Sequence, residues 1–162
     1  MRYSEKNSYM NIYADNPDVV KMLVNIDENG LVKSRALLWE SVEDKDGKKY
    51  KIMDRIYSVY DHEVNSFKKW ATENGYIYKY EQSAKSELLF VTPEGVKDLR
   101  LSIRLDNWKI RKYPYIDTFK YLNFRDGILS NTDRFNYDFI LVQNDGSLER
   151  IEEPEPEPDD NW

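Results

Sequence analysis

Apolar and polar residues alternate with a period of two along several short segments of this 162-residue chain, which predicts β-strands. The first three strands are expected at Val19–Ile26, Leu31–Glu40 and Lys49–Val59. A tight turn at Glu28-Asn29-Gly30 joins the first pair, and a polar connection centred on Lys45-Asp46 joins the second. Together these segments predict an antiparallel meander.

The second and third strands predict a hairpin with one mostly apolar face. In the expected register Leu37 lies opposite Asp54, and Trp39 lies opposite Ile52. The period of two then places these residues on one face: Arg35, Leu37, Trp39, Ile52, Asp54 and Ile56. Arg35 and Asp54 are diagonal neighbours there. They predict either an ion pair that closes the hairpin or a site in which Asp54 acts as a base or anchoring carboxylate and Arg35 binds an anion.

A helix is expected at Asp61–Asn74, where apolar residues recur with helical spacing. Asp61 can cap its first turn, and Gly75 provides the stop. The apolar face consists of Val64, Phe67, Trp70 and Ala71. A shorter amphipathic helix is expected at Asn7–Asp15, before Asn16-Pro17.

The rest of the chain predicts more strands and hairpins. The further strands are expected at Tyr76–Glu81, Ser86–Val91, Leu99–Leu105, Tyr115–Phe124, Asn136–Gln143 and Ser147–Ile151. The pattern therefore indicates an α+β fold: a single domain over residues 1–151, with an antiparallel sheet of roughly six to nine strands covered on one face by the main helix.

The residue types exclude several kinds of chemistry. The chain has no Cys and one His, so we expect no disulfide, no thiolate nucleophile and no metal site, and nothing in the sequence implies a cofactor. No apolar run approaches about 18 residues, and the N-terminus lacks the apolar core of a signal peptide. A cytoplasmic protein without a membrane segment is the expectation.

The net charge of −6 is concentrated at the C-terminus. Residues 152–162 contain six acids, no base and alternating Pro, and they are expected to form an acidic tail outside the folded domain. Its acids are Glu152, Glu153, Glu155, Glu157, Asp159 and Asp160. Without them the chain has 24 acids and 24 bases, which disfavours nucleic acid as a partner. The acidic tail itself favours a protein with a basic surface as the partner.

A second candidate carboxylate is Asp117, which lies in a segment that parallels the third strand. K-Y-P-Y-I-D-T-F-K-Y-L at Lys112–Leu122 shares its Lys, Tyr and Asp with K-Y-K-I-M-D-R-I-Y-S-V at Lys49–Val59. If this is a structural repeat, Asp54 and Asp117 can face a common cleft. Tyr57 completes the candidate binding residues of this face.

Two weaker patterns have surface interpretations beside functional ones. His62, at the start of the main helix, is either an exposed residue or a general base oriented by a neighbouring acid. A set of Tyr and Lys residues is either a wet sheet face or a stacking platform for single strands. Its members are Tyr57, Tyr60, Tyr76, Tyr78, Tyr80, Lys51, Lys68, Lys69 and Lys79.

The order of elements from Val19 to Tyr80 resembles the central part of the GNAT acyltransferases. Its pieces are a strand, a strand with A-L-L-W-E, a strand with M-D-R-I-Y-S-V, a helix with F-K-K-W-A-T-E-N-G-Y and a last strand. In that family the helix opens with a Gly-rich loop whose amides hold the coenzyme A pyrophosphate. Ser58–Glu63 contains no Gly, and Asp61 and Glu63 would repel that group, so the resemblance implies a degenerate GNAT-like core without coenzyme binding.

Other pieces resemble small proteins of tailed bacteriophages. They are Y-x-x-N-P at Tyr13–Pro17, S-R-A-L-L-W at Ser34–Trp39, M-D-R-I-Y at Met53–Tyr57, and P-Y-I-D-T-F-K-Y-L with G-I-L-S-N across Pro114–Asn131. The resemblance implies a phage accessory protein in the host cytoplasm and brings no catalytic residues with it. We therefore expect a non-enzymatic protein that modulates or inhibits a host protein, in defence or elsewhere. The alternative is an acyltransferase-like or other ligand-binding domain that uses the Arg35, Asp54 and Asp117 face.

Overall fold

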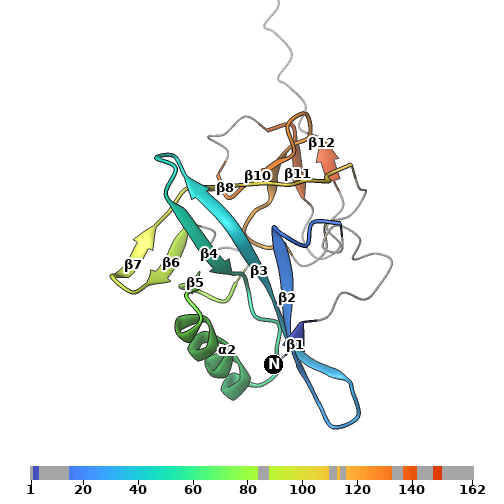
Figure 1. Cartoon of the computed structure of the whole chain (residues 1–162), viewed down its shortest axis with the longest axis vertical. Helices are drawn as coiled ribbons and strands as arrows, with labels where there is room; N and C mark the ends of the chain where they lie inside the picture. Colours follow the sequence, from blue (N-terminus) through green and yellow to red (C-terminus); the bar gives the residue numbers. More distant parts are fainter. Residues whose placement is uncertain are drawn as a thin grey trace, which may run out of the picture.

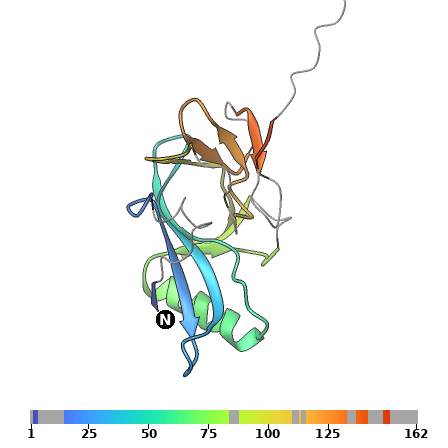
Figure 2. The ribbon, with the colours of Figure 1, turned by 90° about the vertical axis from the view of Figure 1, so that its right-hand side faces the viewer.

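A computed structural model arranges the chain as a large curled sheet, with a single α-helix among the residues it describes (Figures 1 and 2). The described residues are 2–3, 15–83, 88–109, 113, 116–132, 137–141 and 148–150. The helix is α2, Asp61–Glu73. The strands are β1 Arg2–Tyr3, β2 Val20–Ile26, β3 Val32–Asp44, β4 Lys49–Met53, β5 Ile77–Lys79, β6 Leu89–Thr92, β7 Gly95–Asp98, β8 Leu101–Arg104, β9 Tyr121–Asn123, β10 Ile128–Ser130, β11 Phe139–Leu141 and β12 Leu148–Arg150. The fold is mostly β, which is loosely compatible with the expected α+β class.

Strand β3 organises the sheet because, at 13 residues, it is long enough to pair with several neighbours. One edge pairs antiparallel with β2, from Val20 opposite Trp39 to Ile26 opposite Val32. The other edge pairs antiparallel with β4, so the predicted meander is confirmed. Near its end, at Glu43 and Asp44, β3 also pairs with β8, which connects it to β10, β9, β11 and β12.

The sheet is mixed, so the prediction of a purely antiparallel sheet is wrong. β4 and β5 run parallel, with Ile52 opposite Ile77 and Met53 opposite Tyr78. The physical reason is α2, which lies between them in the chain. A helical crossover returns the chain to the end of the sheet at which β4 began, so β5 can run in the same direction as β4.

Several strand boundaries differ from the sequence pattern. The strand expected at Lys49–Val59 ends at Met53, and among the described residues of the strand expected at Tyr115–Phe124 only Tyr121–Asn123 form a strand. Residues 116–119 are buried, but residues 116–120 are not part of a strand, so the proposed repeat is not a repeat of strands. The predicted hairpin near the C-terminus is confirmed by the pairing of β11 with β12. Most of the helix expected at Asn7–Asp15, and the whole acidic tail, lie outside the described residues.

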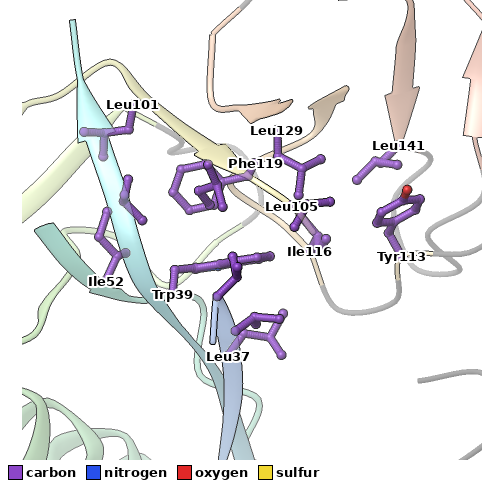
Figure 3. Close-up of a cluster of buried hydrophobic side chains, with 14 of the residues drawn as sticks. Leu37, Trp39, Ile52, Leu101, Leu105, Tyr113, Ile116, Phe119, Leu129 and Leu141 are labelled. Carbon is purple, nitrogen blue, oxygen red and sulfur yellow. The ribbon is translucent and has the colours of Figure 1, made fainter. Parts of the chain in front are cut away.

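The larger buried cluster lies between β2–β4 and the C-terminal strands (Figure 3). Trp39 of β3 is fully buried and meets the ring of Phe119 edge-on, with 5.4 Å between ring centroids. Leu37 and Ile52 lie beside Trp39, while Leu129 approaches from β10. Aromatic burial of this size contributes strongly to stability, and it brings residues 116–119 against the β3–β4 hairpin.

The smaller buried cluster contains the helix. Phe67 and Ala71 of α2 are buried in the same cluster as Ala36 and Leu38 of β3, and Val64 and Trp70 pack partly against it. Ala36 and Leu38 of β3 therefore face this cluster while Leu37 and Trp39 face the larger one, as the period of two requires, and Val42 faces the larger cluster again after the register shift. The predicted apolar face of the helix is confirmed. The predicted cap is not: Asp61 is the first helical residue, and Tyr60 is the N-cap without a side-chain hydrogen bond.

Candidate functional site

The hairpin register next to Asp54 is the predicted one. Trp39 pairs with Ile52, and the backbone N–H of Asp54 donates to the carbonyl of Leu37 (2.8 Å). The turn spans one residue more than expected, because the N–H of Asp44 bonds to the carbonyl of Lys48. A register shift between Trp39 and Val42 absorbs this residue and preserves the pairing near Asp54.

A further extra residue is accommodated between Asp54 and Tyr57. Arg35 exchanges both backbone hydrogen bonds with Tyr57 (3.0 and 2.8 Å), where a uniform register would place Ile56. A one-residue shift turns the side chains to the opposite face. Ile56 accordingly packs in the smaller cluster, and the prediction that it shares a face with Arg35 and Asp54 is wrong.

Asp54 is fully buried and is held by hydrogen bonds instead of an ion pair. Its Oδ1 accepts from the Thr118 hydroxyl (2.6 Å) and from the backbone N–H of Arg55 (2.8 Å), and its Oδ2 accepts from Nε1 of Trp39 (3.3 Å). Among the ion pairs of the described residues none contains Asp54, so the predicted pair with Arg35 does not form. The register shift explains this, because it removes the diagonal alignment of the two side chains.

Asp117 lies beside Asp54 and contacts the other predicted site residue, Tyr57. The Tyr57 hydroxyl donates to Oδ2 of Asp117, and Nη1 of Arg55 lies 3.7 Å from the same oxygen. The Arg55 guanidinium also lies over the Tyr57 ring, 5.1 Å from its centroid. The structure therefore brings Asp54, Asp117 and Tyr57 together and adds Arg55, which the sequence pattern did not single out.

Burial and neighbouring charge disturb the titration of this group. Burial raises the pKa of Asp117 and the charge of Asp54 adds to the rise, while the bond from Tyr57 and the nearby Arg55 oppose it. Burial also raises the pKa of Tyr57, and its hydrogen bond to Asp117 raises it further. Tyr57 therefore stays protonated and acts as a donor.

An open pocket of about 320 Å³ lies over this network. Arg35 and Lys33 line it from β3, and Arg55, Tyr57 and Ser58 line it from the segment after β4. Three of the lining residues are cations and two carry hydroxyls. Solvent at this surface therefore meets positive groups, with the carboxylates of Asp54 and Asp117 buried below.

A second buried carboxylate centre was missed by the sequence reasoning. Glu63 of α2 accepts hydrogen bonds from Ser34, from Ser58 (2.8 Å) and from Nδ2 of Asn25 (2.9 Å), and Nζ of Lys33 lies 3.6 Å away. The Ser34 hydrogen bond is the main cause of a lowered pKa of Glu63. The available signal was Ser34, a hydroxyl on the same strand face as Ala36 and Leu38, where a buried polar group needs a partner.

The weaker surface patterns do not form one site. His62 is exposed and lies 5.5 Å from the Tyr60 ring. Tyr76 is buried and stacked on Trp70, and Lys79 is buried with its Nζ bonded to the Ser83 carbonyl (2.7 Å). The Tyr and Lys residues therefore do not share one open stacking face. Within the described ranges, no three His, Cys, Asp or Glu side chains group as a metal site.

Comparison with known proteins does not assign this site. No protein-family model, curated protein sequence or solved structure matches the chain. In the described part of the chain, no helix has the length and apolar character needed to cross a membrane.

Proposed function

We propose that this chain is a phage accessory protein that binds a host protein and modulates or inhibits it. The acidic, Pro-spaced segment Glu152–Trp162 would provide the main contact with a basic surface of the partner. The observation that carries this proposal is that the whole net charge of −6 belongs to this segment, since the rest has equal numbers of acids and bases.

The arrangement of the buried acids supports a binding protein over an enzyme. Asp54 accepts three hydrogen bonds from within the chain, Glu63 accepts three and faces Lys33, and Asp117 is bonded by Tyr57. These hydrogen bonds use the carboxylates to connect segments of the fold. Recognition then depends on groups at the surface and in the acidic segment.

The test is affinity purification from bacterial host lysate with the full chain and with a variant whose acidic segment is neutral. The variant replaces each Glu with Gln and each Asp with Asn at 152, 153, 155, 157, 159 and 160. We expect the full chain to retain a stoichiometric host protein that is released by added salt, because salt screens exposed charges. The neutral variant should bind the purified partner at least tenfold more weakly, by about 1.4 kcal/mol or more.

A matched control neutralises four Glu and two Asp on the folded body. They are all exposed: Glu28, Glu43, Glu73, Glu81, Asp46 and Asp61. This control should bind the partner as the full chain does. The proposal fails if no stoichiometric partner is retained, or if both variants lose the partner equally.

An acyltransferase-like domain is the second candidate, favoured by the observed order β2, β3, β4, α2, β5. We propose that α2 covers one face of this unit, as in the degenerate GNAT-like core suggested by the sequence. The start of α2 disfavours a bound pyrophosphate, because Asp61 and Glu63 lie in its first turn. A calorimetric titration with acetyl-coenzyme A should therefore give no binding heat. Micromolar one-to-one binding would place this candidate first.

A further inference from the structure

We propose that the pocket over the Tyr57–Asp117 pair binds a small molecule through an oxyanion, a phosphate or carboxylate group. The pocket is formed where the chain after β4 shifts register against β3, and it is lined by Lys33, Arg35, Arg55, Ile56, Tyr57, Ser58 and Val59. Its volume of about 320 Å³ is at the lower end for a small-molecule site. This site is independent of partner binding through the acidic segment.

Two cationic groups of the pocket lie near carboxylates without forming hydrogen bonds to them. Nζ of Lys33 lies 3.6 Å from Glu63, and Nη1 of Arg55 lies 3.7 Å from Asp117. These distances are too long for hydrogen bonds. In the described part of the chain, neither head group donates a side-chain hydrogen bond, so their N–H groups are available to a ligand.

In both ion pairs the cationic side chain is far more exposed to solvent than the carboxylate. The side chains of Lys33 and Arg55 are 40% and 35% exposed, whereas those of Glu63 and Asp117 are 4% and 7% exposed. The cations therefore reach solvent and the carboxylates do not. A ligand entering the pocket approaches the positive ends of these pairs, and a guanidinium is well suited to an oxyanion because it can donate two parallel hydrogen bonds.

An aromatic ring and an apolar side chain surround the charged groups of the pocket. The Arg55 guanidinium lies over the Tyr57 ring, 5.1 Å from its centroid, and this contact limits the side-chain freedom that is lost on binding. Val59 is 84% exposed at the rim and offers an apolar contact to the rest of a ligand. An oxyanion with a short apolar substituent matches this combination.

The test is an NMR titration of the full chain with inorganic phosphate, with chloride of equal ionic strength as the reference. We expect saturable shifts of the amides of residues 55–59 with phosphate and not with chloride. The double variant K33Q/R55Q should weaken binding at least tenfold. The control K45Q/K69Q, which removes two exposed charges elsewhere, should bind as the unmodified chain does.

A second variant keeps the proposal testable if K33Q/R55Q does not fold. Val59→Asp places a negative charge at the rim without touching the buried clusters, and it should weaken phosphate binding severalfold, whereas Val59→Asn should not. Repeating the titration on the chain with the neutral acidic segment and on the control with six neutral acids on the body separates two sources of oxyanion: tighter phosphate binding in the first alone identifies the carboxylates of the acidic segment as competitors for the same site. The proposal is overturned if neither form of the chain shows saturable binding, if chloride produces the same shifts, or if K33Q/R55Q and V59D bind normally.

Discussion

Asp54, Glu63 and Asp117, the buried acids of the described residues, are each held by donors from distant parts of the chain. Asp54 follows β4 and accepts from Thr118, and Asp117, the neighbour of Thr118, accepts from Tyr57. Both bonds therefore connect residues 117–118 to the segment after β4. Glu63 joins the first turn of α2 to Ser34 of β3. A buried acceptor with several donors is costly to remove, because every donor then loses its partner.

Replacing Asp54 should therefore destabilise the fold. Asp54→Ala leaves the Thr118 hydroxyl and Nε1 of Trp39 buried without an acceptor, which should cost about 3 kcal/mol in the free energy of unfolding. Adding Arg35→Met should recover none of this loss, since the two residues form no ion pair. Urea unfolding measures the effect, with Asp106→Ala, an exposed acid, as the control within about 0.5 kcal/mol. An Asp54→Ala protein as stable as the parent would mean that this carboxylate is kept for binding.

The lowered pKa of Glu63 predicts a pH dependence of stability. The folded state favours the ionised form, so its stabilisation is fully present above the ordinary pKa of 4.5 and is lost as the pH falls through the lower folded value. Glu63→Gln should cost about 2 kcal/mol near neutral pH, and the difference from the parent chain should shrink in acid. Denaturant unfolding across this pH range gives the measurement.

Asp117 provides the contrast, because its folded pKa is raised. Its stabilising effect is present at low pH and is lost as the pH rises through the folded value. The stability of the parent chain relative to Asp117→Asn should therefore fall with rising pH, opposite to the Glu63 case. Identical pH profiles for the two variants would contradict the assigned hydrogen bonds.

At the scale of the elements, turns and register shifts determine where each helix or strand ends. Gly75 ends α2 with φ of +79°, and Gly127 turns the chain between β9 and β10 with φ of +70°. A side chain at Gly75 would meet open space, whereas a Cβ at Gly127 would lie 2.3 Å from Cε3 of Trp108. An alanine at either position would be strained by the positive φ, and the two positions differ in the space available to its Cβ.

Gly75→Ala and Gly127→Ala should thus differ measurably in stability. The first should cost about 1 kcal/mol from the left-handed backbone alone. The second adds overpacking against Trp108 and should cost about 3 kcal/mol in total. Thermal or urea unfolding compares them. Equal losses would show that Trp108 moves freely away from the turn.

The β3–β4 hairpin shows which features of an element a sequence pattern can predict. Pairing of Trp39 with Ile52 followed from alternation and a polar turn, because each depends on neighbouring residues. The extra residue between Asp54 and Tyr57 did not follow, since a shift depends on what packs against the strand from elsewhere. That single shift separated Arg35 from Asp54 and turned Ile56 to the opposite face. Asp54 and Asp117 were found by residue type and the Glu63 centre was missed, and the donors Thr118 and Ser34 could not be paired with their carboxylates from the sequence.

At the scale of the whole molecule, the sheet is curled (Figure 2). Strand β3 contributes to two buried clusters, one on each of its faces. The larger cluster joins β3 to residues of β8, β9 and β10, which lie at least 57 positions further along the chain, the separation of the paired Asp44 and Leu101. Such distant pairing carries no local signal. This is why the meander and the helix were predicted while the wrapping of the C-terminal strands was not.

The acidic segment should contribute little to the stability of this body. Deleting Glu152–Trp162 removes six acids and a terminal Trp, and each residue of the two buried clusters lies before it. We expect the free energy of unfolding to change by no more than about 0.5 kcal/mol, with an unchanged urea m-value, because surface changes away from packed groups have small effects. Urea unfolding of the full and shortened chains measures both quantities. A large loss of stability, restored by a chain that keeps Trp162 but has the six acids neutralised, would show that Trp162 packs against the body. In that case the segment would be part of the fold, and its role as the contact for a basic partner would have to be given up.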